Sequence, residues 1–408
     1  MQTNLADFIR GTHDGDEAEA ILRACVHCGF CTATCPTYQL LGDELDGPRG
    51  RIYLIKQVLE GAMPTHKTQL HLDRCLTCRN CETTCPSGVK YGRLVDIGRK
   101  VVDARVVRGR REKLTRMTLR HLLPNTALFG AAFKAGLAVR PLLSKALQDK
   151  LQPPRHAGMR PTRAHARKML VLEGCVQPAM APSINAAAAR VLDALGVQLI
   201  SAPKAGCCGA VRYHLNDQEA GLDDMRRNID AWWPYIDQVE AIVMTASGCG
   251  VTVKEYGHLL AHDSAYAAMA ARISAMTLDL SEIMPQFEAA LAAKIAGKFG
   301  ERVAFHPPCT LQHGQQIRGK VESVLRAVGV DVVLCHDSHL CCGSAGTYSV
   351  LHPAIAHELR DAKLANLHAT GATAIVSANV GCLSHLQSGT DTPVTHWIEL
   401  IDRALGTT

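Results

Sequence analysis

Residues 25–36 read Cys25-Val26-His27-Cys28-Gly29-Phe30-Cys31-Thr32-Ala33-Thr34-Cys35-Pro36, and residues 75–86 repeat the cysteine spacing as Cys75-Leu76-Thr77-Cys78-Arg79-Asn80-Cys81-Glu82-Thr83-Thr84-Cys85-Pro86. In each run, three cysteines stand at every third position, and a fourth follows four positions later, directly before a proline. This spacing is typical of loops that hold a [4Fe–4S] cluster on thiolates. The sequence therefore predicts two such clusters.

The fourth cysteine of each run is expected to serve the cluster of the other run. Three thiolates from one tight loop wrap a corner of the cubane, and the loop does not reach around it, so the fourth ligand crosses over. The expected ligands are Cys25, Cys28, Cys31 and Cys85 for cluster 1, and Cys75, Cys78, Cys81 and Cys35 for cluster 2. Zinc usually takes two Cys-x-x-Cys pairs, or cysteine with histidine, so the spacing favours iron and sulfur.

The composition sets the broad class of protein. The chain has 408 residues, of which 47% are hydrophobic and 17 are cysteines, and this length predicts two or three domains. Residues 1–19 are acidic and lack the apolar segment of a signal peptide, so the thiols are expected to stay reduced and to bind metal. The sequence has no run of about 18 apolar residues that would predict a transmembrane helix.

Residues 1–105 are predicted to form an α-helical domain around the two clusters. Helical periodicity is found over 1–22, 50–61 and 91–105. The loop before the second of these helices contains Arg49 and Arg51. Their guanidinium groups are expected either to offset the negative charge of a thiolate-bound cluster or to lie in solvent.

Residues 106–167 are predicted to be a linker. A basic segment, 99–121, precedes an apolar segment, 122–147, that prolines interrupt. This pattern fits peripheral contact with an anionic membrane, and it fits packing on a partner subunit equally well. Residues 150–168 are rich in proline and arginine and are expected to be exposed. The formal net charge of +6 is mild and gives no reason to expect nucleic acid as a partner.

The rest of the chain is an internal repeat, over 168–295 and 296–408. Short β-branched runs alternate with helical segments in both halves, which predicts a small parallel sheet with helices around it. The expected strands are 169–172, 197–201 and 242–245, then 303–305, 331–334 and 375–378. The expected helices are 184–195, 218–232, 320–328 and 353–367. The predicted fold class is multidomain α+β, with a helical two-cluster ferredoxin domain followed by two small α/β repeats.

Cysteines follow the predicted strands of each repeat. They are Cys175, Cys207, Cys208 and Cys249 in the first half and Cys309, Cys341, Cys342 and Cys382 in the second. Ligands of open α/β sheets bind at the carboxyl ends of the strands, so the four thiols of each half are expected to converge.

Three interpretations of these thiols stay open. They form an additional metal centre, they carry out thiol and disulfide redox chemistry, or they are buried structural cysteines. Cys335 has no counterpart in the first half and is interpreted as structural. Histidines gather in the loops of the second half, namely His306, His313, His339 and His385, and His385 is a candidate ligand or proton donor because it follows Cys382 closely.

The chain resembles the iron–sulfur subunits of bacterial glycolate oxidase. The resemblance rests on both cysteine runs, on the loop 47–51, on Asp230-Ala231-Trp232-Trp233, and on the segments 205–210 and 337–346 that contain the adjacent cysteines. The repeats are similar to the cysteine-rich CCG domains of heterodisulfide reductase, which end in Cys-x-x-Cys. Thr252 and His385 stand where that last cysteine is expected, which argues against a five-cysteine cluster.

The resemblance implies an electron-transfer subunit. FAD-binding partner subunits would oxidise glycolate to glyoxylate, and this chain would relay electrons to membrane quinone, peripherally on the cytoplasmic side of the inner membrane. It implies two [4Fe–4S] clusters, with a further cluster in a CCG domain as an open alternative, and no flavin here, since no dinucleotide fingerprint is present. The alternative functions are a subunit of a lactate or glycerol-3-phosphate dehydrogenase and a thiol/disulfide reductase.

Overall fold

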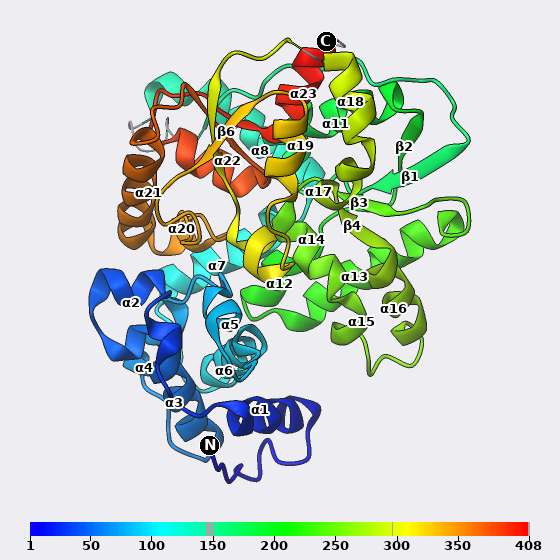
Figure 1. Cartoon of the computed structure of the whole chain (residues 1–408). Helices are drawn as coiled ribbons and strands as arrows, with labels where there is room; N and C mark the ends of the chain where they lie inside the picture. Colours follow the sequence, from blue (N-terminus) through cyan, green and yellow to red (C-terminus); the bar gives the residue numbers. More distant parts are fainter. Residues whose placement is uncertain (144–147, 149–150, 296, 407–408) are drawn as a thin grey trace. The chain divides into compact units, whose positions relative to one another are not determined.

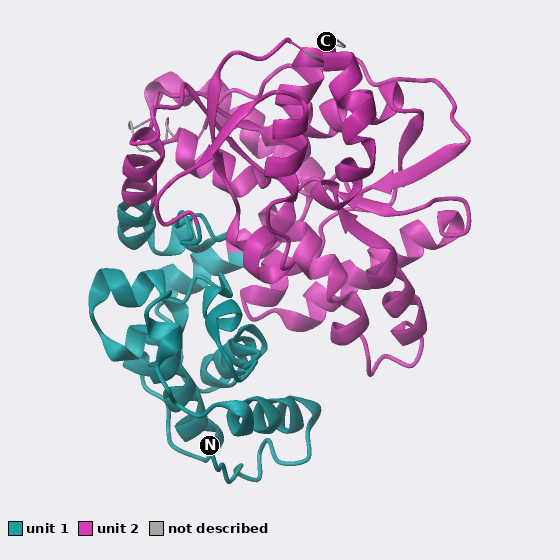
Figure 2. Ribbon diagram, viewed as in Figure 1, with its two compact units in different colours: residues 1–117, 339–359 teal, residues 118–338, 360–408 magenta. Residues whose placement is uncertain are grey.

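The computed structural model describes residues 1–143, 148, 151–295 and 297–406. The chain divides into two compact units. Unit 1 comprises Met1–Met117 and His339–Leu359, and unit 2 comprises Thr118–Ser338 and Arg360–Thr408 (Figure 2). A segment of the second repeat, 339–359, is thus grouped with the residues that carry both cysteine runs.

Unit 1 is built from helices. They are α1 (His13–Ala24), α2 (Pro36–Leu41), α3 (Pro48–Leu59), α4 (His66–Asp73), α5 (Asn80–Thr84), α6 (Tyr91–Arg105) and, from the later segment, α20 (Tyr348–Leu351) (Figure 1). The helices predicted over 50–61 and 91–105 are confirmed. The helix predicted over 1–22 is wrong for its first half, because the helix begins only after Thr12, whose side chain caps it by accepting a hydrogen bond from the Gly15 amide.

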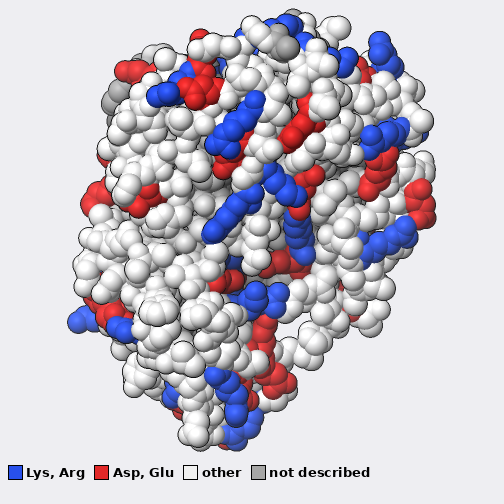
Figure 3. All heavy atoms as spheres, viewed as in Figure 1, with Lys and Arg blue, Asp and Glu red and all other residues white. Residues whose placement is uncertain are grey.

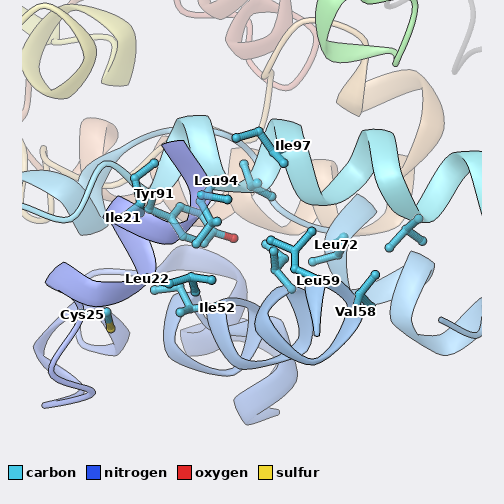
Figure 4. Packing of buried hydrophobic residues seen from close by; sticks show 14 of the residues in the cluster. Ile21, Leu22, Cys25, Ile52, Val58, Leu59, Leu72, Tyr91, Leu94 and Ile97 are labelled. Carbon is cyan, nitrogen blue, oxygen red and sulfur yellow. The ribbon is translucent and has the colours of Figure 1, made fainter. Parts of the chain in front are cut away.

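The core of unit 1 lies between α1, α3 and α6. Figure 4 shows Leu22 of α1, Ile52 and Leu59 of α3, and Leu94 of α6 directed into one cluster. Cys25, Cys75 and Cys81 belong to the same buried cluster. The apolar faces of the helices therefore fix the positions of the cysteine loops, whose own regular structure is limited to a 3-10 helix at Phe30–Thr32 and the short helix α5.

The predicted linker contains two further helices, α7 (Arg110–Leu122) and α8 (Thr126–Ala138). Two arginines of the basic segment that precedes α8 form ion pairs within the protein. Arg108 pairs with Asp73, Asp103 and Glu112, and Arg116 pairs with Asp73 and Glu112. Part of the apolar segment predicted over 122–147, and the first residue of the linker over 150–168, lie outside the described residues.

Unit 2 contains two four-stranded parallel sheets. The first has β1 (Arg167–Val171), β2 (Val197–Ser201), β3 (Ile242–Met244) and β4 (Thr277–Asp279) in the order β2-β1-β3-β4. The second has β5 (Arg302–His306), β6 (Asp331–Leu334), β7 (Ala374–Ser377) and β8 (Val394–His396) in the order β6-β5-β7-β8. The identical topology confirms the internal repeat and the predicted fold class. The six predicted strands are present, and β4 and β8 were not predicted.

Helices connect the strands in both repeats. The first repeat has α10 (Gln177–Met180), α11 (Pro182–Ala194), α12 (Ala210–His214), α13 (Gln218–Trp232), α14 (Ser247–Lys254), α15 (Tyr256–Leu259), α16 (Ala267–Met276), α17 (Leu280–Ile283) and α18 (Glu288–Ile295). The second has α19 (Lys320–Ala327), α21 (Pro353–His368), α22 (Val380–Gln387) and α23 (Trp397–Leu405), besides α20. The four predicted helices correspond to α11, α13, α19 and α21.

The two repeats are joined by buried polar contacts within unit 2. Arg190 of α11 pairs with Asp402 of α23, with 2.6 Å between Nη2 and Oδ2, and both side chains are buried. His396 Nε2 lies 3.0 Å from the carbonyl oxygen of Thr245. A buried ion pair demands a defined geometry, so these contacts fix how the two sheets face each other.

Charged groups are mixed at the surface. On the face drawn in Figure 3, basic side chains lie beside acidic ones instead of forming one large basic field. Among the described residues, no helix combines the length and the apolar character that a membrane crossing requires.

Candidate cluster sites and cysteine-rich repeats

The first cysteine run and one residue of the second form a set of thiols. Burial, and then the negative charges of Cys25, Cys85 and Cys28, raise the pKa of Cys31 to about 11. The pKa of Cys25 is also raised, first by burial and also by the charges of Cys85 and Cys28. These mutual effects require the four side chains to lie near one another. Cys85 therefore sits beside the loop of the other run.

The reciprocal set surrounds Cys81. Burial raises the pKa of Cys81 well above its usual value, and the charges of Cys78, Cys75 and Cys35 raise it further. The structure thus brings Cys35 to the second loop, as it brings Cys85 to the first. Two groups of four thiols fit two [4Fe–4S] clusters. Ligation by these particular residues stays a prediction.

Cluster site 1 lies at the surface of unit 1. A pocket opens beside its thiols, and its lining includes Cys25, Cys28, Cys31 and Cys85. Cys28 is exposed, and the neighbouring Val26 and Phe30 are 68% and 62% exposed. An exposed apolar rim around a redox site is typical of a surface that a partner covers.

Arg51 lies beneath cluster site 2. Its guanidinium is buried, donates from Nε to the His71 carbonyl oxygen at 2.7 Å, and donates from Nη1 to Thr37 Oγ1 at 3.2 Å. Thr37 Oγ1 is in turn 3.3 Å from the sulfur of Cys35. Burial alone would lower the pKa of Arg51, but the charges of Tyr91, Cys75, Cys35 and Asp46 outweigh it and raise the pKa.

Arg51 and Arg74 share one buried carboxylate. Asp46 pairs with Arg51 at 3.5 Å and with Arg74 at 2.8 Å. One carboxylate thus faces two guanidinium groups. Arg49, by contrast, pairs with Glu44 near the surface. The sequence left two roles open for the arginines of the loop 47–51. Arg51 fits the role of compensating the charge of a cluster, and Arg49 fits a position near solvent.

The segment 339–348 contacts the second cysteine loop within unit 1. Asn80 Nδ2 donates to the His339 carbonyl oxygen at 3.2 Å, and the Tyr348 hydroxyl donates to the Arg74 carbonyl oxygen at 3.0 Å. Burial raises the pKa of Tyr348, and the charges of Cys75 and Cys341 add to the effect. The adjacent cysteines of the second repeat therefore lie on the same segment that covers cluster site 2.

The four thiols of the first repeat converge as predicted. Hydrogen bonds from Cys175 and Cys208 lower the pKa of Cys207 well below its usual value. The pKa of Cys208 is raised by its hydrogen bonds with Cys207 and Cys249 and by burial. The four sulfurs thus form one hydrogen-bonded chain.

Sheet topology explains this convergence. Cys175 follows β1, Cys207 and Cys208 follow β2, and Cys249 lies in the first turn of the helix after β3. In the order β2-β1-β3-β4, the crevice forms at the carboxyl ends of β1 and β3. The turn after Cys208 needs glycine, since Gly209 has φ of +91° and a Cβ there would come within 2.6 Å of the Gly221 carbonyl oxygen.

In the second repeat, the structure places two of the predicted thiols at the equivalent sheet edge of unit 2. Cys309 follows β5, and Cys382 lies on α22 after β7. Cys341 and Cys342 belong to the segment grouped with unit 1, so the convergence of all four stays a prediction. Cys335 is buried, which raises the pKa of its thiol. Thr252 donates its hydroxyl to the Gly248 carbonyl oxygen within α14, and His385 is buried.

His306 is a candidate that the sequence noted without assigning it to a site. It ends β5 and is 1% exposed. Burial lowers the pKa of its imidazole well below the usual value, and the charge of Lys363 lowers it further. The first repeat has Leu172 at the equivalent position. The signal in the sequence was a polar residue at the end of an otherwise apolar strand.

Two family models match the chain, in three places. The 4Fe-4S dicluster domain matches residues 21–89, and the cysteine-rich domain matches residues 169–254 and 303–387. The chain is 54% identical to the glycolate oxidase iron–sulfur subunit of Escherichia coli over 99% of both chains. The chain belongs to the family of glycolate oxidase iron–sulfur subunits.

Further relatives show how far the similarity extends. A probable glycolate oxidase iron–sulfur subunit of Bacillus subtilis is 29% identical over 92% of this chain and 90% of its own length. Lactate utilization protein A of Bacillus licheniformis is 24% identical over 52% of this chain and 87% of its own length. As a member of the glycolate oxidase iron–sulfur subunit family, this chain carries [4Fe–4S] clusters and transfers electrons.

Replacing Arg51 tests its effect on cluster 2. Arg51→Gln is expected to lower the reduction potential of cluster 2, because the buried positive charge favours the more negative, reduced form. A unit charge within about 10 Å contributes on the order of 1–2 kcal/mol at an effective dielectric constant near 20, or on the order of 50–100 mV for one electron. An EPR-monitored redox titration measures the potential.

The control variant is Lys56→Gln, which removes a charge from the same helix at the Glu60 pair. Lys56→Gln should leave the reduction potentials of both clusters unchanged. Arg51→Gln also leaves the buried carboxylate of Asp46 with less positive charge beside it. Arg74→Gln therefore serves as a milder variant, and it should lower the reduction potential of cluster 2 by a smaller amount. Equal potentials of cluster 2 in all four proteins would contradict the assignment.

Proposed function

We propose that this chain relays electrons within a glycolate oxidase complex, from FAD-binding subunits that oxidise glycolate to glyoxylate towards membrane quinone. The observation that carries the proposal is the pair of crossed thiol sets, in a chain 54% identical over 99% of its length to a glycolate oxidase iron–sulfur subunit. [4Fe–4S] clusters, when bound, accept and release single electrons. Such a chain connects a two-electron flavin reaction to a separate acceptor.

In this proposal each part of unit 1 has a defined task. Cys25, Cys28, Cys31 and Cys85 hold cluster 1, and Cys75, Cys78, Cys81 and Cys35 hold cluster 2. The exposed rim at Val26 and Phe30 receives the flavin subunit. Arg51 stabilises the negative charge that arrives at cluster 2.

The exit from cluster 2 leads to the second cysteine-rich repeat. Support comes from the two hydrogen bonds that join the segment 339–348 to Arg74 and Asn80. Electrons transfer more readily through short covalent and hydrogen-bonded connections than across gaps. The adjacent cysteines Cys341 and Cys342 are carried by this segment, so the segment is the candidate acceptor within unit 1.

Two alternatives draw on specific observations. A related lactate dehydrogenase role is supported by the similarity to lactate utilization protein A, which covers about half of this chain. A thiol/disulfide reductase role is supported by the hydrogen-bonded chain of Cys175, Cys207, Cys208 and Cys249. The greater identity and coverage of the glycolate oxidase subunit favour glycolate.

Replacing Cys28 tests the relay. In the purified complex, Cys28→Ser is expected to lower glycolate-dependent reduction of a quinone analogue at least tenfold, because cluster 1 loses a thiolate. Glycolate oxidation with a dye that takes electrons directly from flavin should persist. Cys335→Ser, at the cysteine interpreted as structural, is the control. Wild-type quinone reduction by Cys28→Ser, with an EPR signal showing that cluster 1 is altered, would refute the relay.

Peripheral membrane contact is the second part of the proposal, and α7 is its candidate surface. Arg110, Arg111 and Lys113 are exposed there. The apolar side chains of Val107, Leu114 and Met117 nearby are 83%, 59% and 47% exposed. Basic and apolar side chains together suit the surface of an anionic bilayer.

Vesicle flotation of the full chain tests this surface. Replacing Arg110, Arg111 and Lys113 by Gln is expected to weaken binding to anionic vesicles on the order of 100-fold, since each basic residue contributes about 1 kcal/mol. Replacing the exposed Lys67, Lys90 and Lys204 by Gln removes the same charge elsewhere and should have little effect. Equal losses in the two triple variants would mean that net charge, and not α7, determines binding.

A further inference from the structure

Tyr91 is a buried tyrosine at the start of α6, in the core of unit 1 (Figure 4). Its side chain is 4% exposed, and its hydroxyl oxygen has no hydrogen-bond partner of regular geometry among the residues that the structure describes. A phenol hydroxyl both donates and accepts hydrogen bonds, and leaving it unpaired in an apolar interior is costly. The hydroxyl therefore needs an acceptor that the protein chain does not supply.

Tyr91 borders both cluster sites. It lines the pocket beside cluster site 1, together with Cys25 and Cys85 of the first thiol set and Cys81 of the second. Cys75 and Cys81 belong to the same buried cluster of side chains as Tyr91. The side chain is thus next to thiols predicted to hold each of the two clusters.

The charges that act on the Tyr91 hydroxyl belong to site 2. Burial raises the pKa of Tyr91 well above its usual value, the charges of Cys75 and Cys81 raise it further, and the charge of Arg51 opposes them. A hydrogen-bonding interaction with the Cys75 sulfur is smaller than these effects, in keeping with the lack of a partner of regular geometry. The hydroxyl thus lies towards site 2 and keeps its proton, so it is available as a donor.

The backbone at Tyr91 is anchored to the helix that carries Cys81. The Gly92 amide donates to Glu82 Oε1 of α5 at 2.6 Å. A Cβ at Gly92 would come within 2.8 Å of Arg79 Nε and 2.9 Å of Glu82 Oε1, so the two helices meet here without room for a side chain. This contact holds the start of α6, and with it the tyrosine ring, in a defined position beside the second cysteine loop.

We propose that the Tyr91 hydroxyl donates a hydrogen bond to a sulfur atom of cluster 2, on the side of Cys75, and thereby raises the reduction potential of that cluster. Reduction adds negative charge, so a donor at sulfur stabilises the reduced form more than the oxidised form. The inference rests on the assignment of cluster 2 in the proposed function, and it is independent of the substrate and of the acceptor of the complex.

A redox titration of Tyr91→Phe in the anaerobically purified full chain tests the inference. The cluster 2 signal is the EPR signal that Cys78→Ser alters. At a fixed ambient potential, the ratio of reduced to oxidised cluster 2 should fall about tenfold, which corresponds to about 59 mV for a one-electron couple. Cluster 1 should keep its wild-type potential. An unchanged potential of cluster 2 in Tyr91→Phe would overturn the proposal.

Tyr348→Phe is the matched control. Tyr348 is also buried in unit 1, and the charge of Cys75 acts on it as well. Its hydroxyl, however, donates to the Arg74 carbonyl oxygen at 3.0 Å. Tyr348→Phe should therefore leave the potential of cluster 2 close to that of the wild type. Equal shifts in both variants would mean that the loss of any buried hydroxyl has this effect, and the specific role of Tyr91 would be refuted.

Electron–nuclear double resonance of the reduced protein gives a readout that a packing role would not change. Wild-type protein in H₂O and in D₂O should reveal an exchangeable proton coupled to cluster 2. This proton signal should be absent from Tyr91→Phe and present in Tyr348→Phe. A signal that persists in Tyr91→Phe would show that another group is the donor.

A second measurement applies if Tyr91→Phe does not assemble its clusters. In Tyr348→Phe protein labelled with fluorotyrosine, the more acidic hydroxyl of residue 91 is a stronger donor, so the potential of cluster 2 should rise. An unchanged potential would again overturn the proposal.

These outcomes are separate from those of the relay test. Wild-type protein without two [4Fe–4S] signals would count against the proposed function itself. An unchanged cluster 2 potential in Tyr91→Phe, with both signals present, would overturn only the role of Tyr91.

Discussion

The structure depends on the geometric requirement that a compact cluster be held by thiolates from two directions. In the predicted ligation, a loop with cysteines at every third position supplies three of them, and the fourth comes from the other loop. The crossing of Cys35 and Cys85 therefore ties the two loops together. Helices α1, α3 and α6 pack around this pair and keep its geometry. Because each cluster depends on both loops, the two sites are expected to assemble together.

Charge compensation is the second constraint on unit 1. Thiolate-bound clusters are anionic, and the interior around Cys35 and Cys75 offers little solvation. Arg51 is fully buried and supplies a compensating positive charge. Asp46 and Thr37 hold its guanidinium in place. Cluster site 1 is instead open to solvent at Cys28. Two sites with the same cysteine spacing thus differ in their surroundings.

The cysteine spacing, being local, predicted the two cysteine loops, and apolar periodicity predicted the helices α3 and α6. The repeat was predicted because cysteines and apolar runs recur at fixed intervals. The strands β4 and β8 were missed because each is three residues long and carries no clear alternation. The first helix was placed too early because residues 1–12 contain apolar positions at helical spacing, whereas the cap at Thr12 sets the start.

Other features depend on tertiary contacts that no local pattern records. The sequence left the role of Arg51 open, since an arginine in a glycine-rich loop is usually solvated. The grouping of 339–359 with the cluster loops joins residues far apart in the chain. His306 was one of several histidines in the sequence, and only its burial without a partner separates it from the others.

The crossed ligation of the two clusters is tested most directly by EPR and Mössbauer spectra of Cys85→Ser in the full chain. Cys85 belongs to the second run in sequence but, in this account, to cluster 1. The substitution should alter the cluster signal that Cys28→Ser alters and leave the signal that Cys78→Ser alters unchanged. A change confined to the Cys78-dependent signal would contradict the crossing and the arrangement built on it.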